Sequence, residues 1–273
     1  MKPENVPKKS PDSIRISVIG DSITNGLGHW PQKLADLINS PYIEIADFAA
    51  SGSTVSESAF KDKPMKPYRY TDQYEMFKVS EPDMVMFMLG SCDSKLENWA
   101  MNSRQNFEEE YYHWLEYLSN MPSVQRVYAM IPPPILPCIT RDKLDHIGVQ
   151  IVNEYFPSKI PDLVERLNNA PDNDKRPQVE IIDIFGFLGG HDINILNQWC
   201  EDPKLDGFHY GFDKIAESVF TYLSVTLNLD LMHEFHRIEE RGWLKEGERI
   251  WHAGAVLEKK NQLGLKGLPV ALI

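Results

Sequence analysis

The sequence predicts an α/β protein whose parallel sheet is covered by helices on both faces. Apolar runs of strand length alternate with segments of helical periodicity between residues 14 and 227. This alternation is typical of parallel sheets, because their crossover connections place helices on both faces. The run 84–89 is almost entirely apolar, as expected for a strand buried on both faces. Hydrophobic residues make up 42% of the 273-residue chain, so a large core is available.

The expected elements follow one another in a simple order. Strands are expected at 14–19, 42–48, 84–89, 127–131 and 179–184. Apolar residues spaced by three and four predict helices at 30–38, at 107–118 and at 215–223, the last with Asp213 as its N-cap. The stretch 151–167 is expected to be helical in parts and broken near Pro157 and Pro161. Residues 61–74 are expected to form a loop, either a substrate lid or a solvated connection.

We divide the chain into a polar N-terminal tail (1–13), a main domain (14–227) and a C-terminal extension (228–273). The extension departs from the strand and helix alternation and ends in the apolar run 268–273. An exposed apolar end would be unfavourable, so it is expected to fold back on the domain or to dock on a partner. His233, Glu234, His236 and Glu239 in this extension could bind a metal, but a solvated helix face is the expectation.

Composition excludes several classes of function. The net charge of -12 argues against nucleic-acid binding, because phosphates would be repelled. Cys92, Cys138 and Cys200 show neither metal-ligand spacing nor a disulfide framework, so no metal is expected. Glycine-rich phosphate motifs are absent, so no cofactor is expected. No signal peptide or membrane span is visible, and we expect an intracellular, cytoplasmic protein, with assembly in an organelle as the alternative.

Three polar turns follow predicted strands, at 20–24, 51–54 and 90–94. Ligands of parallel sheets bind beyond the carboxyl ends of the strands, so these turns should converge at one edge. The first turn, Gly20-Asp21-Ser22-Ile23-Thr24, would present a serine there. Near the other end of the chain, Asp206-Gly207-Phe208-His209 offers a base and an acceptor.

A serine hydroxyl becomes a useful nucleophile only beside a base, which in turn needs an orienting acceptor. Ser22 is therefore predicted to act as nucleophile, His209 as base and Asp206 as the acceptor that fixes the imidazole. The structural alternative is that Asp206 caps a turn and His209 packs beneath the last helix.

These motifs resemble the SGNH (GDSL-type) esterases and acylhydrolases. The four blocks are Gly20 to Thr24, the glycine of Ala50-Ser51-Gly52, Gly90-Ser91-Cys92-Asp93, and Asp206 to His209, in the family's order. The resemblance implies a flavodoxin-like three-layer α/β/α sandwich with a parallel five-stranded sheet. It also implies an oxyanion hole formed by the backbone N–H groups of Ser22 and Gly52.

The third block departs from the family pattern. The family usually has an asparagine where this chain has Cys92, and a thiol is a weaker donor than a carboxamide. A weakened oxyanion hole is therefore expected, and a redox role for the Cys92 thiolate is a less favoured alternative because Asp93 opposes ionisation.

The stretch 88–95, with Trp99 after it, resembles the carbohydrate-acetylesterase branch of the family. This implies a small acyl ester of a carbohydrate or similar alcohol as substrate, and we assign Asp21, Asp93 and Trp99 to substrate binding. Trp30, Tyr68, Tyr70 and Trp99 could stack on a sugar, although packing is favoured for all four. The rival hypothesis is a catalytically impaired accessory subunit that binds a protein partner, or forms a homo-oligomer, through residues 228–273.

Overall fold

The computed structural model describes residues 6, 8–10, 13–25, 29–40, 42–57, 66–101, 104–136, 146–171, 176–192, 194–195 and 211–226. The chain divides into two compact units, Met1–Ser218 and Val219–Ile273. The predicted extension 228–273 lies outside the described residues.

The main sheet, in the described part of the chain, has five parallel strands in the order β2-β1-β5-β6-β7. This confirms the predicted parallel five-stranded sheet, and the strand order is the one found in flavodoxin-like folds. The central strand β5 is buried along its whole length, as its apolar sequence predicts. The strands are β1 (Ile14–Gly20), β2 (Ile43–Asp47), β5 (Met84–Met88), β6 (Arg126–Ile131) and β7 (Val179–Asp183).

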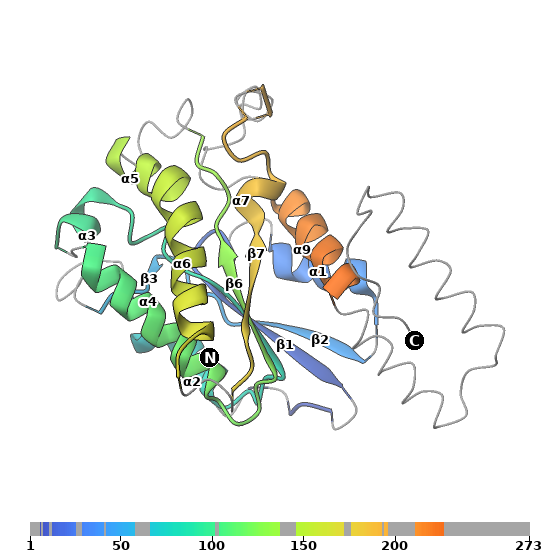
Figure 1. Cartoon of the computed structure of the whole chain (residues 1–273). Helices are drawn as coiled ribbons and strands as arrows, with labels where there is room; N and C mark the ends of the chain where they lie inside the picture. The colour runs from blue at the N-terminus through green and yellow to red at the C-terminus, as the bar shows by residue number, and fades with distance from the viewer. Residues whose placement is uncertain are drawn as a thin grey trace. The chain divides into compact units, whose positions relative to one another are not determined.

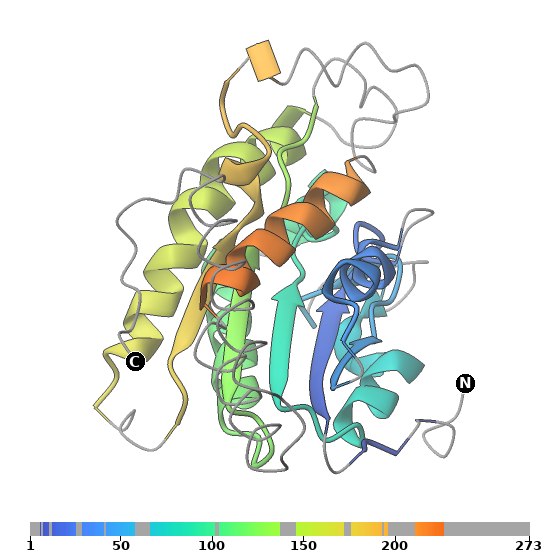
Figure 2. The same cartoon turned by 90° about the vertical axis from the view of Figure 1, so that its right-hand side faces the viewer.

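Helices cover both faces of this sheet (Figure 1, Figure 2). α4 (Arg104–Ser119) and α6 (Phe156–Asn168) pack on one face, and α2 (Asp72–Lys78) joins them through an aromatic contact between Tyr74 and Trp114. α1 (Trp30–Ile38) lies on the opposite face against β2, with Lys33 paired to Asp213 in the first turn of α9 (Phe212–Thr226). The shorter elements are β3 (Ser53–Thr54), β4 (Lys66–Pro67), the 3-10 helix η2 (Tyr68–Tyr70), α3 (Leu96–Met101), α5 (His146–Gln150), the π-helix η3 (Ile151–Tyr155) and α7 (Ile184–Phe187).

The prediction of a helix broken at two prolines is wrong. α6 runs without interruption from Phe156 to Asn168, with Pro157 in its first turn and Pro161 inside it. Pro157 fits because the N–H groups of a first turn have no partner within the helix. Pro161 removes one hydrogen bond, but Phe156, Ile160, Leu163, Val164 and Leu167 are all buried along one stripe. Burying these side chains outweighs the loss, since each contributes about 1.5–3 kcal/mol.

The expected loop at 61–74 and the expected cap at Asp213 also need correction. Residues 66–74 form β4, η2 and the start of α2, while 61–65 lie outside the described residues. The side chain of Thr71 caps α2 by accepting the N–H of Tyr74 at 3.1 Å. Threonine is a preferred N-cap residue, so the sequence itself indicates this start of a helix. Asp213 is not the N-cap but lies within the first turn of α9, where a carboxylate still favours the positive end of the helix dipole.

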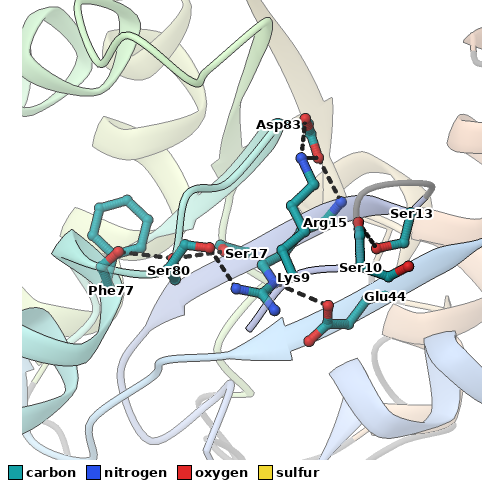
Figure 3. Close-up of polar contacts among 9 residues, drawn as sticks. All are labelled: Lys9, Ser10, Ser13, Arg15, Ser17, Glu44, Phe77, Ser80 and Asp83. Atoms are coloured by element: carbon teal, nitrogen blue, oxygen red, sulfur yellow. Dashed lines mark hydrogen bonds and ion pairs between the residues drawn. The ribbon is translucent and has the colours of Figure 1, made fainter. Parts of the chain in front are cut away.

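The amino edge of the sheet is held by an ionic cluster around Arg15 (Figure 3). The Arg15 side chain is only 2% exposed; its Nε donates to Glu44 at 2.9 Å and its Nη1 to the Ser80 carbonyl at 2.5 Å. Asp83 accepts the backbone N–H of Arg15 at 2.7 Å and pairs with Lys9 at 2.5 Å. This cluster fixes the start of β1, whose far end carries the serine turn.

Replacing Arg15 with Ala is expected to lower the free energy of unfolding by about 2–4 kcal/mol, because it leaves a buried carbonyl and a half-buried carboxylate without their donor. Urea denaturation measures the loss. Lys78→Ala is the matched control: Lys78 pairs with Glu75 on the surface at 2.9 Å, and its loss should change stability by no more than about 0.5 kcal/mol. Equal, small effects in both variants would contradict the assigned role of Arg15.

Candidate active site

The three polar turns meet at the carboxyl edge of the sheet, as predicted. Gly20 at the end of β1 lies opposite Met88 at the end of β5, so the first and third turns leave neighbouring strands. Ala50 N–H donates to the Gly20 carbonyl at 2.9 Å, which brings the second turn beside the first. The β1 and β5 ends are the switch point of this strand order, where ligands of such sheets bind.

The serine turn exposes Ser22 and buries its neighbours. Asp21, Ile23 and Thr24 are at most 1% exposed, whereas Ser22 is half-buried. Asp21 holds the turn: its side chain accepts the Ile23 N–H at 2.9 Å and its carbonyl accepts the Thr24 N–H at 3.2 Å. Gly20 is required before it because a Cβ there would overlap the Thr24 side chain. The turn therefore offers one reachable hydroxyl on a rigid support.

The second turn places Gly52 beside the serine turn. Gly52 has φ of 79°, a left-handed conformation that favours glycine, and Ser53 N–H closes the turn on the Ala50 carbonyl at 3.1 Å. Asn25 joins the two turns by donating its side-chain amide to the Ala49 carbonyl at 3.2 Å.

The third turn is bonded to both of the others. Ser91 donates its hydroxyl to the Asp21 carboxylate. Asp93 accepts the backbone N–H of Val55 at 2.9 Å and that of Ser56 at 3.0 Å. The turn itself is closed by Ser94 N–H on the Gly90 carbonyl at 3.1 Å, and Asn98 donates to the Cys92 carbonyl at 2.6 Å.

Cys92 is a buried, neutral thiol. It is 2% exposed, and burial, together with the nearby carboxylates Asp21 and Asp93, raises its pKa well above the usual value, although Lys95 opposes this. A thiolate, the reactive form of cysteine, is therefore disfavoured here. These surroundings favour a weak hydrogen-bond donor over a redox group.

Asp21 and Asp93 have internal partners for their carboxylates. Asp93 is fully buried, and this burial, with smaller contributions from Asp21 and Glu110, raises its pKa to about 7 despite the two backbone N–H bonds. Asp21 is bonded to Ile23 and Ser91. Both carboxylates are thus bonded to the turns themselves.

The aromatic residues singled out from the sequence separate into two groups. Trp30 and Tyr68 are fully buried, so the favoured expectation of packing is confirmed for them, and Tyr70 is a surface residue at 62% exposed. Trp99 is half-buried on α3, with its ring centroid 5.6 Å from that of Phe107 and 5.5 Å from that of Tyr155. Trp99 thus follows the third turn and packs against these two rings in tilted and edge-to-face arrangements.

One residue that holds a loop at this edge of the sheet was not found from the sequence. Asn153 in the π-helix η3 bonds both backbone groups of Ile135, accepting from its N–H at 2.7 Å and donating to its carbonyl at 2.9 Å. This fixes the loop that follows β6 at the same edge of the sheet. A single asparagine in a segment that seemed irregular gives no signal of such a role.

Several predicted residues cannot be placed. Asp206 and His209 lie outside the described residues, as do His233 and His236. Within the described residues, no group of three His, Cys, Asp or Glu side chains could hold a metal ion. Over the same residues, no helix is long and apolar enough to cross a bilayer.

Comparisons with known proteins identify the family. The family model of the GDSL-like lipase/acylhydrolases matches residues 16–211, which is most of the chain. The chain belongs to the GDSL-like lipase/acylhydrolase family, a family of carboxylic ester hydrolases.

The proteins to which this chain is similar include carbohydrate esterases. An acetylxylan esterase of Xylanibacter ruminicola is 30% identical over 115 residues, which cover 39% of this chain and 23% of that protein's length. A carbohydrate acetylesterase from Sinorhizobium meliloti has a TM-score of 0.56 at 13% identity, covering 78% of this chain and 99% of the other. An acetyl xylan esterase has a TM-score of 0.52 at 16% identity, covering 77% and 100%. These structures share the fold.

Proposed function

We propose that this protein is a serine esterase that removes a small acyl group, such as acetyl, from a carbohydrate or similar alcohol. One observation carries the proposal: Ser22 is half-buried within an otherwise buried turn, beside the Gly52 turn and at the switch point of the sheet. Family membership and the similarity to an acetylxylan esterase support the choice of reaction and substrate class.

The proposed reaction has two halves. Ser22 Oγ attacks the ester carbonyl carbon while His209 takes the hydroxyl proton, and Asp206 accepts the other imidazole N–H. The carbonyl oxygen becomes an oxyanion held by the N–H groups of Ser22 and Gly52. His209 then gives its proton to the leaving alcohol oxygen as the C–O bond breaks. In the second half, water loses a proton to His209 and attacks the acyl carbon. The bond between this carbon and Ser22 Oγ then breaks, His209 returns the proton to Ser22 Oγ, and the acid is released.

The three residues assigned to substrate binding take different roles in this proposal. Trp99 remains the candidate for contact with substrate, because it is half-buried and follows the third turn. Asp21 and Asp93 are assigned to positioning the turns, in place of the predicted substrate contact, because both are buried and bonded internally.

The acyl preference tests this function. Hydrolysis of p-nitrophenyl esters should have its highest kcat/KM with acetate and fall by roughly tenfold or more at octanoate, because a site shaped for acetyl excludes longer chains. Acetate should also be released from an acetylated xylo-oligosaccharide. Ser22→Ala is the control for uncatalysed and contaminating hydrolysis. A higher kcat/KM with octanoate than with acetate would contradict the assigned acyl group.

The second candidate is a catalytically impaired accessory subunit, and Cys92 in place of the family's asparagine is the observation that favours it. A protein partner or homo-oligomer formed through residues 228–273 belongs with this candidate. Wild-type protein that is folded but inactive on every short-chain ester would favour it over the esterase.

A further inference from the structure

Asp93 connects the third turn to the chain that follows Gly52. Its two carboxylate oxygens accept consecutive backbone N–H groups, those of Val55 at 2.9 Å and Ser56 at 3.0 Å. The intervening residues Ser53 and Thr54 form β3 and are at most 1% exposed. A short, buried strand transmits position well, so the location of the Gly52 N–H depends on the Asp93 carboxylate.

The same turn also fixes the serine. Ser91 donates its hydroxyl to Asp21, whose other oxygen accepts the Ile23 N–H at 2.9 Å. Residues 91 and 93 therefore bond the two turns that carry Ser22 and Gly52. Through these bonds the third turn is linked to both turns that carry the proposed oxyanion donors.

The charge on Asp93 decides how many of these bonds it can accept. As a carboxylate it accepts both N–H groups, whereas a protonated carboxyl has one oxygen converted into a donor that faces an N–H. Burial, aided by Asp21 of the serine turn and Glu110 of α4, raises the pKa of Asp93 to about 7. Two other titratable groups lie nearby in the sequence. Cys92 beside Asp93 is a neutral thiol, and Lys95 directly precedes α3. The change of charge therefore falls in the neutral range.

We propose that Asp93 is a positioning residue that holds the Gly52 N–H in place by clamping Val55 and Ser56, and that protonation of Asp93 loosens this clamp. The inference rests on the proposed function, in which the Gly52 N–H stabilises the oxyanion. Asp93 acts through this backbone and does not touch the substrate.

Asp93→Asn tests the clamp, because Asn keeps the shape but accepts through one oxygen only. We expect kcat for an acetyl ester to fall about 10–10²-fold with KM changed less than about threefold, since a misplaced oxyanion donor weakens the transition state and not substrate binding. Asp83→Asn is the matched control: Asp83 also accepts a backbone N–H, from Arg15 at 2.7 Å, but at the opposite end of β5. It should leave kcat unchanged.

The pH dependence of kcat distinguishes this positioning role of Asp93 from a purely structural one. As the pH falls from 7 to 5, kcat of the wild type should fall more steeply than that of Asp93→Asn, because the wild type takes up protons on both His209 and Asp93 whereas the variant takes one up on His209 alone. Equal slopes, together with an unchanged kcat, would overturn the inference.

Hydrogen exchange separates this inference from the proposed function and does not require activity. In Asp93→Asn, the Val55 and Ser56 amides should exchange at least tenfold faster than in the wild type and in Asp83→Asn. In the wild type alone, the amide resonances of these two residues should titrate with a midpoint near pH 7. An active wild type whose two amides show neither effect overturns the clamp. A fully inactive wild type whose amides show both effects overturns the proposed function and the catalytic use of the clamp.

Discussion

Ser22→Ala is expected to lower kcat/KM for acetyl esters by roughly 10⁴-fold or more, because it removes the atom that forms the acyl-enzyme. The residual rate should come from binding and the oxyanion donors alone. Steady-state hydrolysis of p-nitrophenyl acetate, with the product measured by absorbance, gives the ratio. Equal rates for the variant and the wild type would contradict the nucleophile assignment.

The control for Ser22→Ala lies in the neighbouring turn. Ser51 is exposed and donates its hydroxyl to the Asn25 carbonyl at 3.4 Å, a long and weak bond. Ser51→Ala also removes a serine hydroxyl, but from the neighbouring turn, and should keep kcat/KM within about threefold of the wild type. Both variants should unfold within about 0.5 kcal/mol of the wild type, since neither serine is fully buried.

Cys92→Asn is expected to raise kcat about 10–10²-fold. The thiol of Cys92 is neutral and a weak donor, whereas a carboxamide N–H at that position would be a third donor to the oxyanion, and one such donor is typically worth 10²–10³-fold. The expected gain is smaller than this typical value because the other polar groups of the buried amide also need hydrogen-bond partners. Kinetics with an acetyl ester should show the gain in kcat with KM nearly constant.

Cys92→Ala is the matched control for this gain. Because the thiol is expected to add little, its removal should change kcat less than about threefold. If Cys92→Asn is folded, as judged by an unchanged cooperative unfolding transition, and yet slower than Cys92→Ala, position 92 does not face the oxyanion.

The sheet was predictable from the sequence because buried parallel strands are continuous apolar runs. The predicted runs 42–48 and 84–89 differ from β2 and β5 by one residue at one or both ends. The convergence of the three turns was predictable because parallel strands all run in the same direction and therefore end at the same edge of the sheet. The continuity of α6 through Pro161 was not predictable, because the buried stripe that offsets the proline becomes evident only once the helix is packed.

The candidate site was predictable in outline and not in its supports. A serine after a strand and a glycine after the next one are visible as motifs, and the structure places both at one edge. That Asp93 supports Val55 and Ser56 depends on which face of a turn is buried, and the turn sequence gives no sign of it. The roles of Asp206 and His209 stay predictions, since those residues lie outside the described part of the chain.

Labelling with a serine-directed phosphonate tests the central claim most directly, since only a serine activated by a base reacts readily. The full-length wild type should gain one adduct, located by mass spectrometry on the peptide that contains Ser22, and Ser22→Ala should gain none. Absence of an adduct on the folded wild type, or an adduct of equal yield on Ser22→Ala, would contradict the account.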